Sequence, residues 1–182
     1  MKNLLAIALM LGVSGVAGAA EIKSGLQPGD APPAFNVRDV TGPSAGKTLC
    51  YRCQYGPRPV VTIFTRDIEN AATQQLIKEV DATVGKNSDS KMAAFVVLLT
   101  DDPDSAEGKL TEVAKKHGIK NVPLTIFDGV AGPDKYKVSK DADLTVLMWN
   151  ESNVKVNHAF AKGEFKAESV KAVSADTKKI LE

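Results

Sequence analysis

The sequence predicts an α/β fold, and three observations support this class. Strand-like and helix-like segments alternate through most of the chain, which is the order found in α/β domains. Residues 93–100 are almost wholly apolar and β-branched at their centre, a composition typical of a parallel strand covered on both faces. Two strand-like segments joined by a short turn, within residues 144–160, then precede a closing helix.

The N-terminus predicts a secretory signal peptide. Lys2 precedes a nearly continuous apolar run over residues 4–16, and Ala17-Gly18-Ala19-Ala20 supplies the small residues that signal peptidase accepts. The run is short for a membrane span, and no cysteine follows it to accept a lipid. We expect cleavage after Ala19 or Ala20 and a periplasmic or extracellular mature protein without a membrane span, where a disulfide can persist.

The expected organisation is a signal peptide over residues 1–20, a Gly- and Pro-rich lead-in over residues 21–34 and a single domain over residues 35–182. The remaining length, about 160 residues, is enough for one domain with a real core. Lys and Arg number 23 against 22 Asp and Glu, giving a net charge of +1. These charges are interleaved, so we expect no nucleic-acid or membrane partner.

The first half of the domain begins with strand-like segments. Residues 35–40 alternate like a half-buried strand, residues 41–44 form a turn, and residues 47–51 form a short extended piece. Residues 59–65 are typical of a buried strand. From Ile68 onward apolar residues recur every four positions, which predicts an amphipathic helix that Gly85 ends.

The second half continues the alternation. After the strand over residues 93–100, Asp104 and Glu107 resemble a capping box that opens a helix ending at Gly118. A strand is expected over residues 122–127, and a hairpin is expected with strands over residues 144–149 and 154–160. A closing helix is expected over residues 167–181.

This order of elements resembles the thioredoxin fold, and the lead-in resembles that of one branch of it. Gly29-Asp30-Ala31-Pro32-Pro33-Ala34-Phe35 is similar to the G-D-x-x-P-x-F entry of the redoxins and alkyl hydroperoxide reductases. The resemblance covers roughly Leu26 to Glu182. It implies a thioredoxin-like three-layer sandwich, in which helices flank a central mixed sheet that carries an N-terminal β-hairpin extension.

The usual catalytic position of that family holds no cysteine here. The family's reactive thiol follows the first core strand, and the matching residues are Thr65-Arg66-Asp67-Ile68. The family also places a cis-proline against this thiol. Its equivalent is either Pro123 or a position near Ala142–Asp143 that lacks proline. We favour the second, because redoxins often carry an additional strand before the late hairpin.

The chain has only two cysteines, three residues apart in Cys50-Tyr51-Arg52-Cys53. This spacing can close a small disulfide ring, hold a soft metal or exchange electrons with another protein's thiols. The pair precedes the strand over residues 59–65, which is about 20 Å long. Unless the loop folds back, we expect the pair near the opposite end of the fold from the family's site.

A reactive thiol needs a lowered pKa, from a helix N-terminus or from nearby cations. Because residues 56–59, Gly-Pro-Arg-Pro, cannot continue a helix from Cys53, we expect no helix dipole at the pair. The available cations are Lys47, Arg52 and Arg58, of which Arg52 and Arg58 are our candidates for stabilising a thiolate.

The resemblance to other Cys-x-x-Cys proteins implies roles for the two sulfurs. Cys50 would be the attacking thiol and Cys53 the resolving thiol, with exchange through a mixed disulfide. Tyr51, between them, would offer a flat contact surface to a partner.

Two other interpretations of the pair remain open. The first is a structural bridge, although so small a ring should stabilise the fold by less than the roughly 3 kcal/mol expected for a fifteen-residue loop. The second is a copper site, which needs more ligands than two sulfurs. Gln54 follows Cys53, so the c-type haem signature fails.

Both histidines have structural interpretations. His158 shares strand parity with Val154, Val156 and Phe160, as a core histidine would, and it could be a third metal ligand only if it lay near Cys50. His117 falls in the last turn of a predicted helix, where a cation is favourable.

Three further motifs are better explained by structure than by ligands. Residues 41–48 approach a P-loop but lack its first glycine and a following helix, so we expect a hairpin turn. Residues 101–104 are acidic but lack the spacing of a calcium loop, so we expect a helix cap. Arg66 and Asp67 are expected to form an ion pair with helix capping, or otherwise to bind an anion or small ligand.

The sequence therefore predicts an exported thioredoxin-fold protein that exchanges thiols and disulfides with a partner protein through Cys50 and Cys53. We expect no cofactor, no resident metal and no peroxidase activity. The alternative is a non-catalytic binding module whose disulfide is structural, and a copper-binding protein or copper chaperone comes third.

Overall fold

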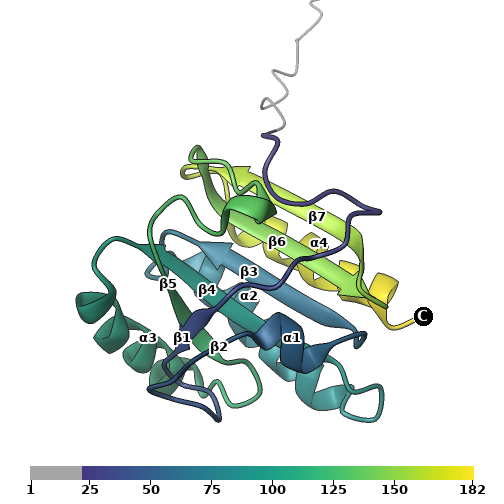
Figure 1. The fold of residues 1–182 in the computed structure, drawn as a ribbon, viewed down its shortest axis with the longest axis horizontal. Coiled ribbons are helices and arrows are strands. Elements are labelled where there is room, and N and C mark those ends of the chain that lie inside the picture. The colour runs from purple at the N-terminus through teal and green to yellow at the C-terminus, as the bar shows by residue number, and fades with distance from the viewer. Residues whose placement is uncertain (1–21) are drawn as a thin grey trace, which may run out of the picture.

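A mixed sheet of seven strands, in the order β2-β1-β5-β4-β3-β6-β7, runs through the centre of the molecule (Figure 1). The computed structural model describes residues 22–182, so the predicted signal peptide lies outside the described residues. The strands are Val37–Asp39 (β1), Thr48–Leu49 (β2), Val60–Thr65 (β3), Ala93–Thr100 (β4), Leu124–Asp128 (β5), Ala142–Asn150 (β6) and Asn153–Ala161 (β7). The α-helices are Tyr51–Tyr55 (α1), Ala71–Lys86 (α2), Pro103–His117 (α3) and Ala167–Ala175 (α4), with 3-10 helices at Asp134–Tyr136 (η1) and Asp176–Ile180 (η2). Within the described range, no helix has the length and apolar character to cross a bilayer.

The strand directions follow the thioredoxin pattern. β3, β4 and β5 are parallel, and β6 and β7 complete one edge as an antiparallel hairpin. β1 pairs antiparallel with both β5 and β2, which confirms the N-terminal hairpin extension. β2 consequently runs in the same direction as β3, and α1 forms the connection between them.

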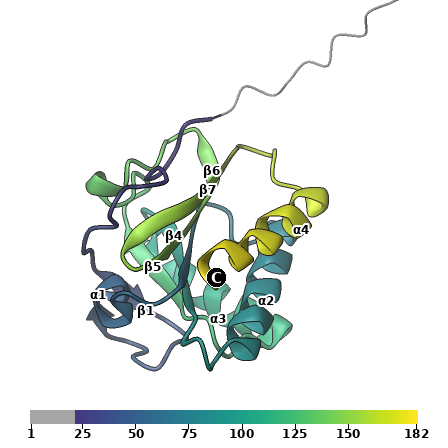
Figure 2. The same cartoon turned by 90° about the vertical axis from the view of Figure 1, so that its right-hand side faces the viewer.

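The two faces of the sheet carry different covers (Figure 2). α2, α3 and α4 pack on one face through an aliphatic core that includes Leu76, Leu110 and Val170. On the other face, α1, η1 and the lead-in enclose a second core that is rich in aromatic residues, among them Tyr51, Phe95 and Trp149. The predicted three-layer α/β arrangement is confirmed.

Local signals fix several of the element ends, and some of these ends differ from the prediction; the predicted closing helix over residues 167–181, for example, is α4 followed by η2. α2 begins at Ala71, where the Asn70 side chain caps the helix by accepting from the N–H groups of Ala72 and Thr73, and it continues one residue beyond Gly85. The cap of α3 is Asp102 rather than Asp104, since its carboxylate accepts from Ser105 N. Pro103 then takes the first helical position, where its missing N–H costs nothing.

The lead-in crosses the aromatic face from the β7 edge to β1 (Figure 1). It pairs with β7 through two backbone hydrogen bonds, from Gly29 N to Val154 O and from Val154 N to Asp30 O. Gly25 N also donates to Lys137 O beyond η1. These contacts hold the segment against the fold beside α1.

Candidate functional site

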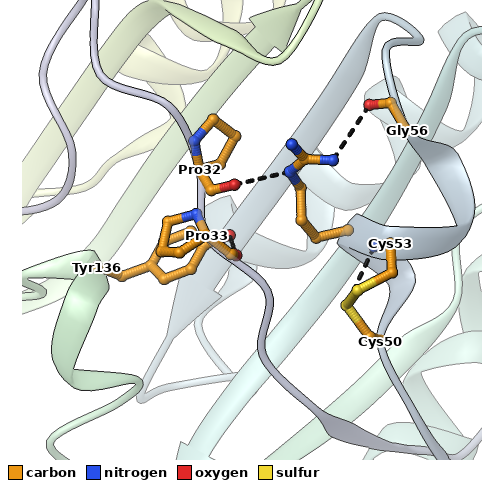
Figure 3. Close-up of a disulfide and its surroundings, with 7 residues drawn as sticks. Pro32, Pro33, Cys50, Cys53, Gly56 and Tyr136 are labelled. Carbon is orange, nitrogen blue, oxygen red and sulfur yellow. Dashed lines mark hydrogen bonds between the residues drawn. A yellow bond between two sulfur atoms is a disulfide. The ribbon is translucent and has the colours of Figure 1, made fainter.

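Cys50 and Cys53 form a disulfide at the start of α1, with their Cα atoms 5.2 Å apart (Figure 3). Cys50 directly follows β2 and is the N-cap residue of the helix. Its Sγ accepts a hydrogen bond from Cys53 N at 3.0 Å. The group that contacts this sulfur is therefore a backbone N–H from the first turn of a helix.

The prediction that no helix forms at the pair is wrong. Residues 51–55 form one short helix, and it ends at Gly56, which has a φ of 59°. Pro57 bars the helical conformation only at the residue before it, so a turn and a half still fits between Cys50 and Gly56.

The two cysteine residues differ in their exposure to solvent. Cys53 is an exposed residue and Cys50 is partly buried. The disulfide is therefore not enclosed by the protein, and a second polypeptide can reach it on the Cys53 side. This accessibility distinguishes the pair from a bridge within the core.

The Tyr51 side chain points into the core, so it holds residues 50–53 in place and does not face a partner. The residue is only 1% exposed, because its ring packs against Phe95 and Tyr55 with centroids 5.6 and 5.3 Å away. Its hydroxyl donates to Asp39 Oδ2 at 2.7 Å. Burial, and then the hydrogen bond to Asp39, raise the pKa of Tyr51. The expected contact surface at Tyr51 is thus wrong, because Phe95 and Asp39 draw the ring into the core.

Asp39 organises the turn beneath α1. This buried carboxylate also accepts from Gly42 N and Ser44 N, both at 2.8 Å. A Cβ on Gly42 would lie 2.5 Å from the Tyr51 hydroxyl, so only glycine fits there. Residues 41–48 are therefore a hairpin turn, as predicted, with a structural reason for its glycine.

Arg52 is directed to backbone carbonyl groups. Its Nε donates to Pro32 O at 2.8 Å and its Nη1 to Gly56 O at 3.4 Å, as drawn in Figure 3. Tyr136 of η1 donates its hydroxyl to Pro33 O at 2.8 Å, so the adjacent Pro32 and Pro33 are held by two different elements. Arg58, the other predicted thiolate-stabilising cation, is exposed.

The position that holds the reactive thiol in the redoxins follows the last residue of β3, away from α1. α1 packs on β4 at Ala94 and Phe95, which pair in register with the first half of β3, whereas Thr65 pairs with Leu98 near the other end. The structure does not bring the disulfide and Arg66 together.

Arg66 and Asp67 do not pair with each other as predicted. Arg66 donates to the carbonyl groups of Val130 and Ala142, and burial lowers its pKa. Asp67 accepts from Glu69 N and Asn70 N at 3.0 and 3.1 Å in the turn before α2. Each side chain therefore contacts backbone groups in place of the expected ion pair. Of these contacts, only the capping by Asp67 was predicted.

The strand next to this position is β6. Arg66 N donates to Asp143 O at 3.0 Å, whereas Pro123 precedes β5, which pairs with β4 and β1 and not with β3. The geometry therefore places Asp143 beside Arg66, and Asp143 belongs to the position that we favoured as the equivalent of the family's cis-proline. Residues 22–182 contain no cis peptide bond.

The side chains of His158 and His117 contact other residues, not Cys50 or Cys53. His158 Nε2 is 2.9 Å from Asp176 Oδ2 in η2, and His117 Nε2 is 2.8 Å from Gln74 Oε1. Among residues 22–182, no three His, Cys, Asp or Glu side chains gather as a metal site would require.

Sequence reasoning overlooked Asp39 and Asn70. Asp39 ends an alternating segment at a parity that places its side chain inward, and the turn Thr41-Gly42-Pro43-Ser44 follows it. Asx residues before turns commonly accept backbone N–H groups, so this signal was present. Asn70 stands directly before the helical periodicity, which is the usual place of an N-cap.

Comparison with known proteins shows what the fold is similar to. No protein-family model and no curated protein matches the sequence. Among solved structures, a candidate thiol:disulfide interchange protein DsbE from Chlorobium tepidum is similar with a TM-score of 0.65 at 15% identity, over 86% of this chain and 99% of that one. The thioredoxin domain of a thiol-disulfide oxidoreductase from Bacteroides vulgatus gives 0.57 at 11% identity, over 82% and 99%. Peroxidoxin BcpB from Mycobacterium tuberculosis gives 0.60 at 14% identity, over 85% and 97%. These similarities show a thioredoxin-like fold.

Proposed function

We propose that this protein is an exported thiol-disulfide oxidoreductase that acts on the thiols or disulfides of a partner protein through Cys50 and Cys53. The observation that carries the proposal is an exposed disulfide at the first turn of a helix, outside the core of a thioredoxin-like fold. Similar structures named for thiol:disulfide interchange and thiol-disulfide oxidoreduction support it. Export to the periplasm or the cell exterior, inferred from residues 1–20, provides conditions in which the bond can form.

The reaction is an exchange of one disulfide for another. A partner thiolate attacks the protein disulfide to give a mixed disulfide, and a second thiolate of the partner then releases the reduced protein. The direction of net electron flow follows the difference in reduction potential between the two pairs. We expect no peroxidase activity, because Thr65-Arg66-Asp67-Ile68 at the family's peroxide-reacting position contains no thiol.

The decisive experiment is the reduction potential of the pair together with an exchange assay. The potential is measured by equilibration with glutathione or dithiothreitol buffers, and activity by insulin reduction or by the refolding of a scrambled disulfide substrate. We expect a potential above about −300 mV and activity that is lost in both Cys50→Ser and Cys53→Ser. Glu69→Gln, an exposed position beside the vacant family site, should retain full activity.

The alternative function is a binding module with a structural disulfide. A potential below about −300 mV with no exchange activity would support this alternative and contradict the proposal. The third candidate, copper handling, now rests on the two sulfurs alone. A Cu(I) absorbance titration tests it, and equal affinity in the Cys50→Ala/Cys53→Ala double variant would eliminate it.

A further inference from the structure

We propose that Cys53 is the sulfur that a partner thiolate attacks and that Cys50 is the sulfur displaced. This inference rests on the proposed function and assigns a direction to the exchange at the same site. It reverses the order that the resemblance to other Cys-x-x-Cys proteins implies. Two independent observations, solvent access and hydrogen bonding, lead to the same order.

The first observation is access. Exchange depends on which sulfur an incoming thiolate can reach. Cys53 is an exposed residue, and so is Gln54 after it, whereas Cys50 is partly buried. The open side of the disulfide is therefore the Cys53 side.

The second observation is the hydrogen bond to Cys50. Its Sγ accepts from Cys53 N at 3.0 Å, while no hydrogen bond within residues 22–182 reaches the Cys53 sulfur. A hydrogen bond to the charged form favours that form, so negative charge is better accommodated on Cys50 than on Cys53. A thiol of lower pKa is the better leaving group in exchange.

The balanced reaction takes two steps. The partner thiolate forms a bond to Cys53 Sγ, the Cys50–Cys53 bond breaks, and its electron pair remains on Cys50 as a thiolate. A second partner thiolate then attacks the partner sulfur of the mixed disulfide and releases Cys53 as a thiolate. The partner gains a disulfide and loses two electrons, which the protein holds as two thiol groups in protonation equilibrium with water.

The same order applies in reverse. When the reduced protein acts on a partner disulfide, the mixed disulfide again forms at Cys53, and Cys50 attacks Cys53 to close the ring. Cys50 is thus the resolving residue in both directions.

The chain itself supplies a direct test, because trypsin cuts between the two cysteines at Arg52. The oxidised mature protein is mixed with reduced glutathione as the probe, quenched early with N-ethylmaleimide and digested. Cys50 is then recovered in residues 48–52 and Cys53 in residues 53–66, because the Arg58–Pro59 bond resists trypsin. Mass spectrometry reports which peptide carries glutathione and which carries the maleimide.

We expect glutathione on the Cys53 peptide and maleimide on the Cys50 peptide, in an excess of about tenfold or more. Glutathione on Cys50, or an equal distribution, overturns the assignment while leaving the exchange function intact. A disulfide that forms no adduct and keeps a potential below about −300 mV overturns the proposed function, and the assignment with it.

The single variants provide a second measurement that does not depend on the probe. Cys53→Ser retains Cys50 and its backbone hydrogen bond, and Cys50→Ser retains Cys53 with a serine oxygen at the N-cap, a favoured residue there. Alkylation rates against pH should give a lower thiol pKa for Cys50 in the first variant than for Cys53 in the second. The opposite order would contradict the assignment, and circular dichroism confirms that both variants are folded.

Discussion

Asp39 and Tyr51 connect the turn after β1 to the helix that carries the disulfide. One buried carboxylate accepts the Tyr51 hydroxyl and two backbone N–H groups. A buried carboxylate is stable only when its oxygens are hydrogen-bonded, so these three donors act together. The position of α1, and of the disulfide at its start, depends on this contact.

Tyr51→Phe tests that dependence. Removing the hydroxyl takes one donor from Asp39, and we expect the free energy of unfolding to fall by about 1–3 kcal/mol. Urea denaturation measures the change. Tyr55→Phe is the matched control, because its hydroxyl reaches Ala94 O only at 3.5 Å, and it should cost less than about 1 kcal/mol. Equal losses in both variants would contradict the role assigned to the Asp39 contact.

At this scale the sequence indicated the residue types of the site but not their environments. The spacing of Cys50 and Cys53 predicted a disulfide ring as one possibility, and the structure contains it. The burial of Tyr51 could not be predicted, because it results from contacts with Asp39 and Phe95, which local periodicity does not place together. For the same reason the hydrogen bond from Arg52 to Pro32 O, twenty residues away in the lead-in, was not foreseen.

At the scale of elements, side chains of α1 and η1 hold the lead-in at Pro32 and Pro33. Arg52 of α1 holds Pro32 O, and Tyr136 of η1 holds Pro33 O. Both contacts lie beside the disulfide (Figure 3). Arg52 is therefore a positioning residue for the surface around the pair.

Arg52→Met should loosen this segment. Loss of the guanidinium hydrogen bond to Pro32 O should lower the free energy of local opening by about 1 kcal/mol, which raises the open fraction of the lead-in about fivefold. Native-state cleavage by elastase after Ala34 should accelerate by that factor, since such cleavage follows the open population. Arg58→Met, at an exposed arginine between α1 and β3, is the control. No difference between the two variants would show that Arg52 does not hold the lead-in.

A second contact between elements, His158 of β7 with Asp176 of η2, predicts a pH dependence. Burial alone would raise the pKa of Asp176, but hydrogen bonds from Lys179 and His158 outweigh it and hold the pKa below its usual value. A carboxylate with a depressed folded-state pKa stabilises the fold above its unfolded pKa, about 3.9, and that contribution is lost as the pH falls through the folded pKa.

Asp176→Asn should therefore be less stable than the natural protein at pH 7, and the difference should shrink as the pH falls below about 4. Thermal unfolding at a series of pH values measures it. A difference that stays constant across this range would mean that the charge of Asp176 contributes nothing to stability.

Element boundaries show where sequence patterns are informative. β4 was predicted with its observed limits, because seven consecutive apolar residues followed by Thr100 are typical of a covered strand. α1 was missed because five residues are too few for a helical periodicity, and the following Gly56-Pro57 pair was taken to exclude a helix. Alternation over residues 35–40 and the turn residues after them predicted the strands of the N-terminal hairpin, and the resemblance to redoxins identified the hairpin as an extension.

For the whole molecule, the buried apolar residues form two cores on either side of the sheet, and neither core includes Cys50 or Cys53. The bond closes a ring of only four residues. Such a ring restricts the unfolded chain little, so its contribution to stability should be about 2 kcal/mol or less. A protein that cycles between disulfide and dithiol must remain folded in both states, and this architecture allows it.

Reduction should therefore leave the protein folded. We expect dithiothreitol to lower the free energy of unfolding by about 2 kcal/mol at most, measured by urea denaturation with and without the reductant. The Cys50→Ser/Cys53→Ser double variant should match the reduced protein. Unfolding on reduction would instead identify the bond as a structural staple.

The anchoring of Tyr51 has a steric consequence for any encounter. The residue between the two sulfurs is rooted in the aromatic core, so the tetrapeptide has no freedom to swing outward and meet a distant thiol. In the exchange proposed above, the partner would therefore have to bring its own cysteine to Cys53 from the solvent side.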